Sequence, residues 1–257
     1  MSVVIGIACE DKGHFSAVSH IIDDMLVASH GWLDGVLEHC RSWRGLVDGE
    51  PWYKYDPDDA NDLRPSTING RRIAPQGRIL GEPLKPEAGM WRKILLLFCH
   101  SEPRPQVVIL VRDVDGFSRE RGKGDRRGGV QQVRDGFDWP FEVVIALAEP
   151  EVEAWLVSGF VPTGSLEKER LNAVRRALSF DPTTESHRLT SHPNDARTDS
   201  KRVLEQLCGT DEERRQACLS DHAMLRERGA MNGLAIFLDE VEQRVVPTFG
   251  GLDKMQL

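Results

Sequence analysis

The chain has 257 residues, of which 40% are hydrophobic and 29% are charged, as is typical of a globular protein with one large core. Its formal net charge of −8 argues against a general polyanion binder with a wholly basic surface. No apolar run reaches the roughly 18 residues that a membrane helix requires, and the first residues lack the basic segment of an export signal, so we expect a soluble, cytoplasmic protein that does not insert into a membrane.

The first predicted element is a buried strand that leads into a helix. Residues 3–8 are apolar and β-branched, which is typical of a strand covered on both faces. Glu10 follows this strand, and apolar residues between Phe15 and Leu26 then recur at helical spacing. A strand, a loop and a helix in this order indicate the start of an α/β sheet.

Residues 44–89 differ from what precedes them. They are rich in Gly, Pro, Asp and Arg and have weak periodicity, which predicts an irregular insertion with a hairpin around Asn69-Gly70. Residues 85–99 again have the apolar spacing of a helix.

Two more strands and a helical C-terminal part complete the predicted fold. Residues 107–111 and 141–148 are the next apolar runs, and helical patterns separate the strands and fill the last third of the chain. This order predicts an α/β protein with a mostly parallel sheet flanked by helices. We expect an α/β domain over 1–210 and a helical extension over 211–257 that packs on it.

Acidic side chains follow all three predicted strands. Because ligands bind beyond the carboxyl ends of parallel strands, these side chains are expected to share one edge of the sheet. Carboxylates crowded together raise one another's pKa, and a hard divalent cation such as Mg²⁺ removes that penalty. The candidates are Glu10, Asp113, Asp115, Glu149, Glu151 and Glu153.

Simpler interpretations of the same residues remain open. Asp113-Val114-Asp115-Gly116 is also a common turn sequence. Glu151 and Glu153 could instead complement the positive end of a helix. His14 lies near the predicted site and could hydrogen-bond a phosphate or a water molecule.

Two segments carry a resemblance to a known superfamily. The first segment, Val3–Gly13, is a predicted strand that ends in Glu, and the second, Val107–Gly116, is a predicted strand that ends in Asp-x-Asp. This pair of motifs, separated by a long spacer, resembles the TOPRIM domain of topoisomerases, bacterial primases and OLD-type nucleases. Residues 148–156, with their Pro-Glu-x-Glu-Ala-Trp sequence, resemble small stand-alone TOPRIM-like proteins of prokaryotic defence systems. The resemblance covers residues 1 to about 210 and implies a Rossmann-like TOPRIM fold, from which the long insertion departs.

The resemblance also implies roles for individual residues. Glu10 would act as a metal ligand or general acid/base, and Asp113 and Asp115 would hold Mg²⁺ or Mn²⁺. Glu153 and Glu151 would complete a second metal site as in OLD-type nucleases. Lys201 is the candidate for the lysine that such enzymes use late in the domain, although a solvated helix lysine is the simpler interpretation.

A basic segment follows the aspartates. Residues 118–129 contain five cations and two anions, and they do not form a Walker A loop because Gly-Lys is followed by Gly. Cations beside a metal site are well placed to bind a nucleic-acid backbone, although a solvated surface loop would have the same composition. The five candidates are Arg119, Arg121, Lys123, Arg126 and Arg127.

The sequence therefore predicts a metal-dependent nuclease that hydrolyses phosphodiester bonds in DNA or RNA. The resemblance to TOPRIM-like defence proteins implies that the protein is the effector of an anti-phage system and works with an ATPase partner. Assembly into a homo-oligomer is left open. One alternative is a non-catalytic module that binds a partner protein. The other is a nucleotidyl transferase of primase type.

Overall fold

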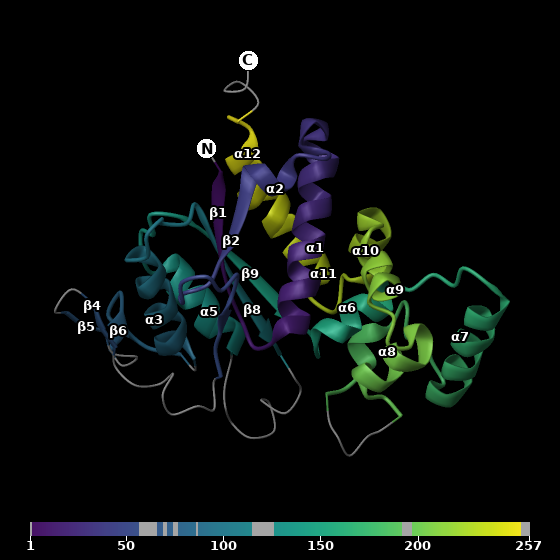
Figure 1. The fold of residues 1–257 in the computed structure, drawn as a ribbon. Helices are drawn as coiled ribbons and strands as arrows, with labels where there is room; N and C mark the ends of the chain where they lie inside the picture. Colours follow the sequence, from purple (N-terminus) through teal and green to yellow (C-terminus); the bar gives the residue numbers. More distant parts are fainter. Residues whose placement is uncertain are drawn as a thin grey trace.

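The chain folds around a parallel sheet with helices on both faces, which confirms the predicted fold class (Figure 1). The computed structural model describes residues 2–56, 66–68, 71–73, 77–85, 87–114, 126–191 and 197–252. Its main sheet has the strand order β2-β1-β8-β9, and a short strand β3 also pairs with β1. No helix in these ranges combines the length and the apolar character that crossing a membrane would require.

Three long strands form the centre of this sheet. They are β1 (Val3–Cys9), β8 (Val107–Asp113) and β9 (Glu142–Ala148). All are parallel, with Ala8 opposite Leu110 and Asp113 opposite Ala148. Almost every side chain in the three strands is buried, as their continuous aliphatic sequences predict. The carboxyl ends of β1, β8 and β9 therefore lie side by side.

One face of the sheet is covered by the first helix and the last ones. Helix α1 (Lys12–Ser29) packs there with α11 (Leu234–Glu240), the π-helical turn η4 (Val241–Val245) and α12 (Val246–Phe249). Trp155 stacks on Phe237 in the same core, and its Nε1 donates a hydrogen bond to the carbonyl oxygen of Asn232. The C-terminal helices thus pack on the α/β domain.

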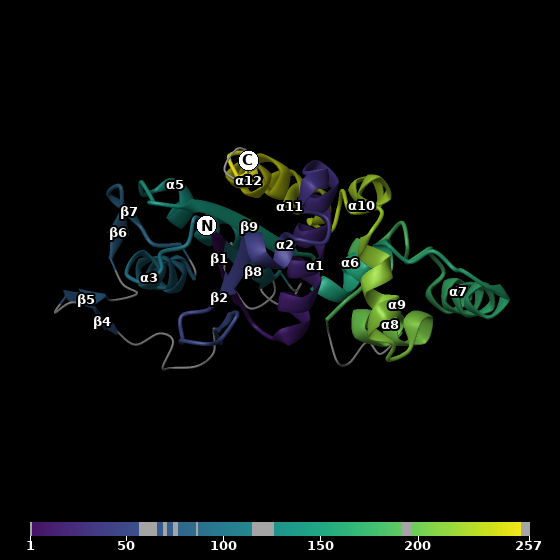
Figure 2. The ribbon, with the colours of Figure 1, turned by 45° about the horizontal axis from the view of Figure 1, so that its top comes forward.

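The opposite face is covered by α3 (Ala88–Cys99) and α5 (Arg126–Asp135), which lie across the sheet from α1 and α11 (Figure 2). The two faces have separate apolar cores. Tyr55 is fully buried in the second core, and its hydroxyl donates a hydrogen bond of 2.8 Å to the carbonyl oxygen of Val111.

A helical lobe extends from the sheet beyond α1 (Figure 2). It contains α6 (Val152–Ser158), α7 (Ser165–Leu178), α8 (Ser200–Cys208), α9 (Glu212–Gln216) and α10 (His222–Arg228), together with the 3₁₀ turns η2 (Ser186–Arg188) and η3 (Ala217–Leu219). A third apolar core joins α6, α7 and α8 to Cys218. This core crosses residue 210, so the helices on either side of the predicted boundary pack together.

The predicted insertion has more regular structure than its sequence indicates. It contributes β3 (Tyr53–Lys54), which pairs with β1 in the main sheet. Before the insertion, the chain passes through the short turns η1 (Gly31–Leu33) and α2 (Leu37–Cys40). Strand β2 (Arg41–Arg44) follows them and also pairs with β1. The predicted hairpin is present, because β4 (Ser66–Ile68) pairs antiparallel with β5 (Arg71–Ile73), although its two turn residues lie outside the described part. A second small hairpin joins β6 (Arg78–Ile79) to β7 (Glu82–Pro83).

Candidate metal centre

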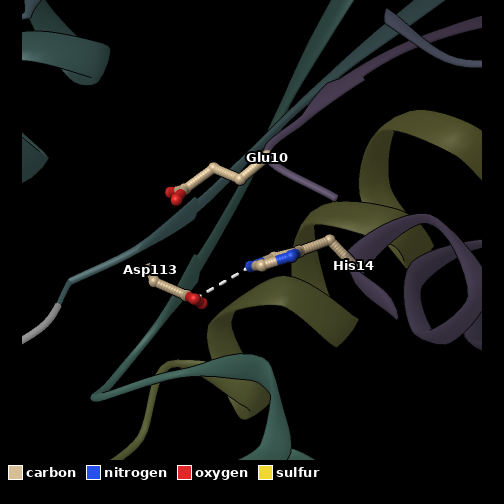
Figure 3. A group of neighbouring side chains, drawn as sticks. All are labelled: Glu10, His14 and Asp113. Atoms are coloured by element: carbon tan, nitrogen blue, oxygen red, sulfur yellow. Dashed lines mark ion pairs between the residues drawn. The ribbon is translucent and has the colours of Figure 1, made fainter. Parts of the chain in front are cut away.

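Glu10 and Asp113 converge at the carboxyl edge of the sheet, as the sequence predicts. Glu10 follows β1, Asp113 ends β8, and the two strands are hydrogen-bonded neighbours. His14 joins them from the first turn of α1, and Figure 3 shows that Asp113 and His14 point toward each other with Glu10 beside them. One ligand atom from each lies within 4.8 Å of the others, so the three residues could hold a metal ion.

Asp11 fixes the position of His14. It is the N-cap of α1, and its Oδ1 accepts hydrogen bonds from the amide nitrogen of His14 at 3.0 Å and from His14 Nδ1 at 2.8 Å. These bonds lower the pKa of Asp11. Because Nδ1 is bound to Asp11, the other ring nitrogen, Nε2, faces the cluster.

His14 Nε2 is the polar atom that lacks a well-formed partner in the cluster. It is buried and forms an ion pair with Asp113, whose Oδ2 lies 2.9 Å away. Burial lowers the pKa of His14, but the bonds and charges of Asp11 and Asp113 outweigh burial and raise it to about 10. His14 therefore carries positive charge at neutral pH and balances part of the acidic edge.

Asp113 also connects the sheet to the helical lobe. Its Oδ1 accepts a hydrogen bond of 3.1 Å from the amide nitrogen of Val152, the first residue of α6. A carboxylate is favourable at the amino end of a helix, where amide groups have no partner in the helix. The same side chain therefore anchors α6 and faces the candidate metal position.

Arg112 is a buried cation behind the cluster that the sequence analysis did not identify. Its side chain is 4% exposed and binds Glu10, and it forms two hydrogen bonds with Glu87 at 3.0 and 3.1 Å. Alternation along β8 turns Arg112 and Asp113 to opposite faces of the sheet. Arg112 thus holds Glu10 in place while leaving it a second carboxylate oxygen for a ligand.

Glu151 and Lys201 form a second polar group beside the first. Glu151 accepts a hydrogen bond of 2.5 Å from the hydroxyl of Ser200 and lies 3.6 Å from the Nζ of Lys201. Burial lowers the pKa of Lys201, but the charges of Glu153, Glu151 and Asp113 outweigh it and raise that pKa. Lys201 therefore faces the acidic edge, as expected, rather than only solvent.

Glu153 lies near this group but outside the three-residue cluster. Burial raises its pKa to about 7, and the charges of Glu151 and Asp113 add to this effect while Lys201 opposes it. In the described part of the chain, the ligand atoms that come within 4.8 Å of one another belong to Glu10, His14 and Asp113, without Glu151 or Glu153. The second metal site expected from these two glutamates stays a prediction.

Most of the predicted nucleic-acid contacts lie outside the described residues. This holds for Arg119, Arg121 and Lys123, for the side chain of Arg126, and also for the predicted metal ligand Asp115. Arg127 is described and forms an ion pair with Glu149, the acidic residue that follows β9. Glu149 is thus engaged with a cation on α5 and does not belong to the three-residue cluster.

The donor set of the cluster determines which ions suit it. Two carboxylates are the ligands that Mg²⁺, Ca²⁺ and Mn²⁺ prefer, whereas an imidazole nitrogen suits transition metals. A set of two carboxylates and one histidine therefore combines the ligand types of both classes of ion. The hydrogen bond that His14 Nδ1 donates to Asp11 Oδ1, on the side of the ring away from the cluster, is the arrangement usually seen behind a metal-binding histidine.

Comparisons with protein-family models, with curated proteins and with solved structures find no match to this chain. The functional interpretation therefore depends on the geometry of the site and on the sequence.

Proposed function

We propose that this protein is a metal-dependent phosphodiesterase that cleaves DNA or RNA. The observation that carries the proposal is the meeting of Glu10, His14 and Asp113 at the carboxyl edge of a parallel sheet. Ligand sites of open α/β sheets lie at this edge. Half-buried carboxylates beside a buried, oriented histidine are a donor set for a divalent ion.

A divalent ion held there would supply a Lewis acid for a phosphate oxygen and lower the pKa of a bound water molecule. Glu10, His14 and Asp113 would hold the ion, and Asp11 would keep His14 in the tautomer that presents Nε2. Since a ligating imidazole must be neutral, binding would displace the proton of His14. We assign Mn²⁺ as the preferred ion and Mg²⁺ as the weaker one.

Other groups have supporting roles in this proposal. Lys201, held near Glu151 with a side chain 58% exposed, is placed to contact a substrate phosphate. Glu10, one of whose oxygens is bound by Arg112, is the candidate to assist proton transfer. The predicted roles of Asp115 and of the cations in 119–127 remain part of the proposal.

The resemblance of Val3–Gly13 and Val107–Gly116 to TOPRIM domains supports the same activity. It suggests an OLD-type nuclease that works with an ATPase partner in antiviral defence. That context remains a proposal by analogy, and the site geometry does not depend on it.

A cleavage assay tests the proposed function. Plasmid, single-stranded DNA and transfer RNA would be incubated with the wild-type chain and Mn²⁺, in parallel with the Glu10→Ala and Asp113→Ala variants. We expect cleavage by the wild type and a loss of at least about 100-fold in each variant. The Asp34→Ala variant, which removes an exposed carboxylate away from the cluster, is the control and should cleave like the wild type.

The outcomes also separate the alternatives. Cleavage that persists in both variants would contradict the proposal. Incorporation of nucleotides in place of cleavage would favour the primase-type transferase. Absence of both activities and of metal binding would favour the partner-binding module.

A further inference from the structure

A hollow of about 480 Å³ opens beside the metal cluster, between α1 and the helical lobe. It lies against the N-terminal half of α1, α6, α8, α9 and η3. His14 lines this hollow and also belongs to the cluster, so the two are continuous.

The walls of the hollow are part aliphatic and part polar, and the polar lining residues are Asp11, His14, Ser16, Glu153, Glu212, Arg215 and Gln216. They come from opposite sides, with Ala17 on α1 facing residues of the lobe, and the apolar lining residues are Ala17, Val152, Leu156, Leu204 and Leu219. Facing apolar walls suit a flat, weakly polar group that stacks between them. A phosphate or a sugar alone would leave these walls in contact with water.

Glu153 is one of three carboxylates among the described residues that line the hollow, with Asp11 and Glu212. Its carboxyl group is hydrogen-bonded by its own amide, and no other described side chain donates to it. Lys201, whose charge lowers the pKa of Glu153, lies within ion-pair distance of Glu151. The half-buried carboxyl group of Glu153 therefore keeps acceptor capacity for a donor from a ligand or from water.

We propose that the hollow binds one nucleobase of the substrate, unstacked from its neighbours, with an exocyclic amino group donating to Glu153. A nucleotide has the two ends that this region requires: a phosphate for the cluster at His14 and a flat base for the aliphatic walls. Adenine, cytosine and guanine carry an exocyclic amino group, whereas thymine does not. The inference extends the proposed function by assigning a substrate with unpaired bases.

This placement has a consequence for the type of strand that is cleaved. Taking a base out of a duplex costs a few kcal/mol, and the cost is smallest in a single strand. We therefore expect single-stranded or looped nucleic acid to be preferred over a perfect duplex. An abasic nucleotide at one fixed distance from the cut should lower kcat/KM by about tenfold.

The decisive experiment uses the four deoxynucleosides, which carry no phosphate, and the full chain. Saturation-transfer NMR measures whether the base protons contact the protein. We expect binding of deoxyadenosine, deoxycytidine and deoxyguanosine, with thymidine about fivefold weaker. In Glu153→Gln this difference should disappear, whereas Glu205→Gln, which makes the same change on an exposed part of α8, should behave like the wild type.

The results separate this inference from the proposed function. If the wild type cleaves nucleic acid but binds no nucleoside, or if Glu153→Gln keeps the preference for amino-bearing bases, the base site is wrong and the nuclease proposal stands. If Mn²⁺ displaces the nucleosides and Glu153→Gln removes a bound ion, the hollow holds a second metal and the inference is overturned. Nucleoside binding with the expected preference supports it even where cleavage fails.

Discussion

Arg112 is the single residue on which the charge balance of the site depends most. Six carboxyl groups lie around three basic side chains here, so the region is strongly acidic. The carboxyl groups belong to Glu10, Asp11, Glu87, Asp113, Glu151 and Glu153, and the basic groups to His14, Arg112 and Lys201. Arg112 is the most buried of the three cations and binds two of the carboxylates at once.

We therefore predict that Arg112→Met is strongly destabilising. It leaves Glu10 and Glu87 without their buried cation, and breaking a buried ion pair from one side costs about 3–5 kcal/mol. Urea unfolding at pH 7 measures the loss. Arg226→Met, which removes a cation that binds the exposed Asp239 and Glu242, should cost less than about 1 kcal/mol. Equal losses in both variants would contradict this account.

Glu167 gives a pH-dependent prediction away from the site. Hydrogen bonds from Arg214 hold the pKa of Glu167 at about 2, below its ordinary value of 4.5. A lowered carboxyl pKa stabilises the fold above the ordinary value, and this stability is lost as the pH falls from 4.5 towards 2. The stability difference between wild type and Glu167→Gln should thus be constant from pH 6 to 8 and shrink below 4.5.

Urea unfolding at pH 7, 4 and 3 checks this dependence. The control is Glu169→Gln, which changes an exposed glutamate on the same helix. If the stability difference between the wild type and Glu167→Gln is the same at pH 7 and at pH 3, the ion pair of Glu167 with Arg214 does not stabilise the fold.

At the scale of elements, Gly233 allows α11 to approach the sheet. It precedes α11 with a φ of +87°, and a Cβ atom placed on it would lie 2.0 Å from the carbonyl oxygen of Leu147 in β9. Only glycine combines this φ with such a close approach to backbone. The following helix carries Phe237, which stacks on Trp155, so the fit of α11 also supports α6.

Gly233→Ala should therefore lower the stability of the fold by more than an alanine at another left-handed position does. Gly35 is the matched control, because its φ is +72° and nothing lies within 4 Å of an added Cβ atom. We expect Gly35→Ala to cost about 1 kcal/mol and Gly233→Ala at least about 2 kcal/mol more. Thermal unfolding of both variants measures this difference, and similar losses would mean that α11 can shift without cost.

The elements that could be predicted from sequence are those with an apolar pattern of their own. Strands β1, β8 and β9 each contain a long aliphatic run, and α1 and α3 have clear helical spacing. Strand β2 has the polar sequence Arg-Ser-Trp-Arg and is half-buried at the sheet edge, and β3 has two residues. Their pairing with β1 depends on the tertiary fold, so no local pattern indicates it.

The candidate site, like the fold, could be predicted only where a local sequence pattern marks the residue. Glu10 and Asp113 could be predicted because each stands at the end of a recognisable strand. The approach of His14 depends on Asp11 capping α1, which brings a residue four positions after Glu10 back over the sheet edge. An Asp three residues before a His at the start of a helix was the available signal. Arg112 and Glu87 meet through a contact between β8 and the start of α3, which sequence spacing does not reveal.

At the scale of the whole molecule, the site lies where the sheet meets the helical lobe. Asp113 binds the first amide of α6, and α8 brings Ser200 and Lys201 to Glu151. The sheet thus supplies the metal ligands, and the lobe supplies the wall of the hollow and the nearby lysine. A ligand that contacts both parts would hold them together, which places substrate binding at their junction.

The most direct test of the central claim is a titration with Mn²⁺ followed by electron paramagnetic resonance or calorimetry. We predict one tightly bound Mn²⁺ per chain, weaker binding of Mg²⁺ at the same position, and an affinity at least about tenfold lower in Asp113→Asn and in His14→Gln. Asp34→Asn, which alters an exposed carboxylate, should bind Mn²⁺ like the wild type. Absence of Mn²⁺ binding, or equal binding in Asp113→Asn and the wild type, would contradict a metal centre at Glu10, His14 and Asp113.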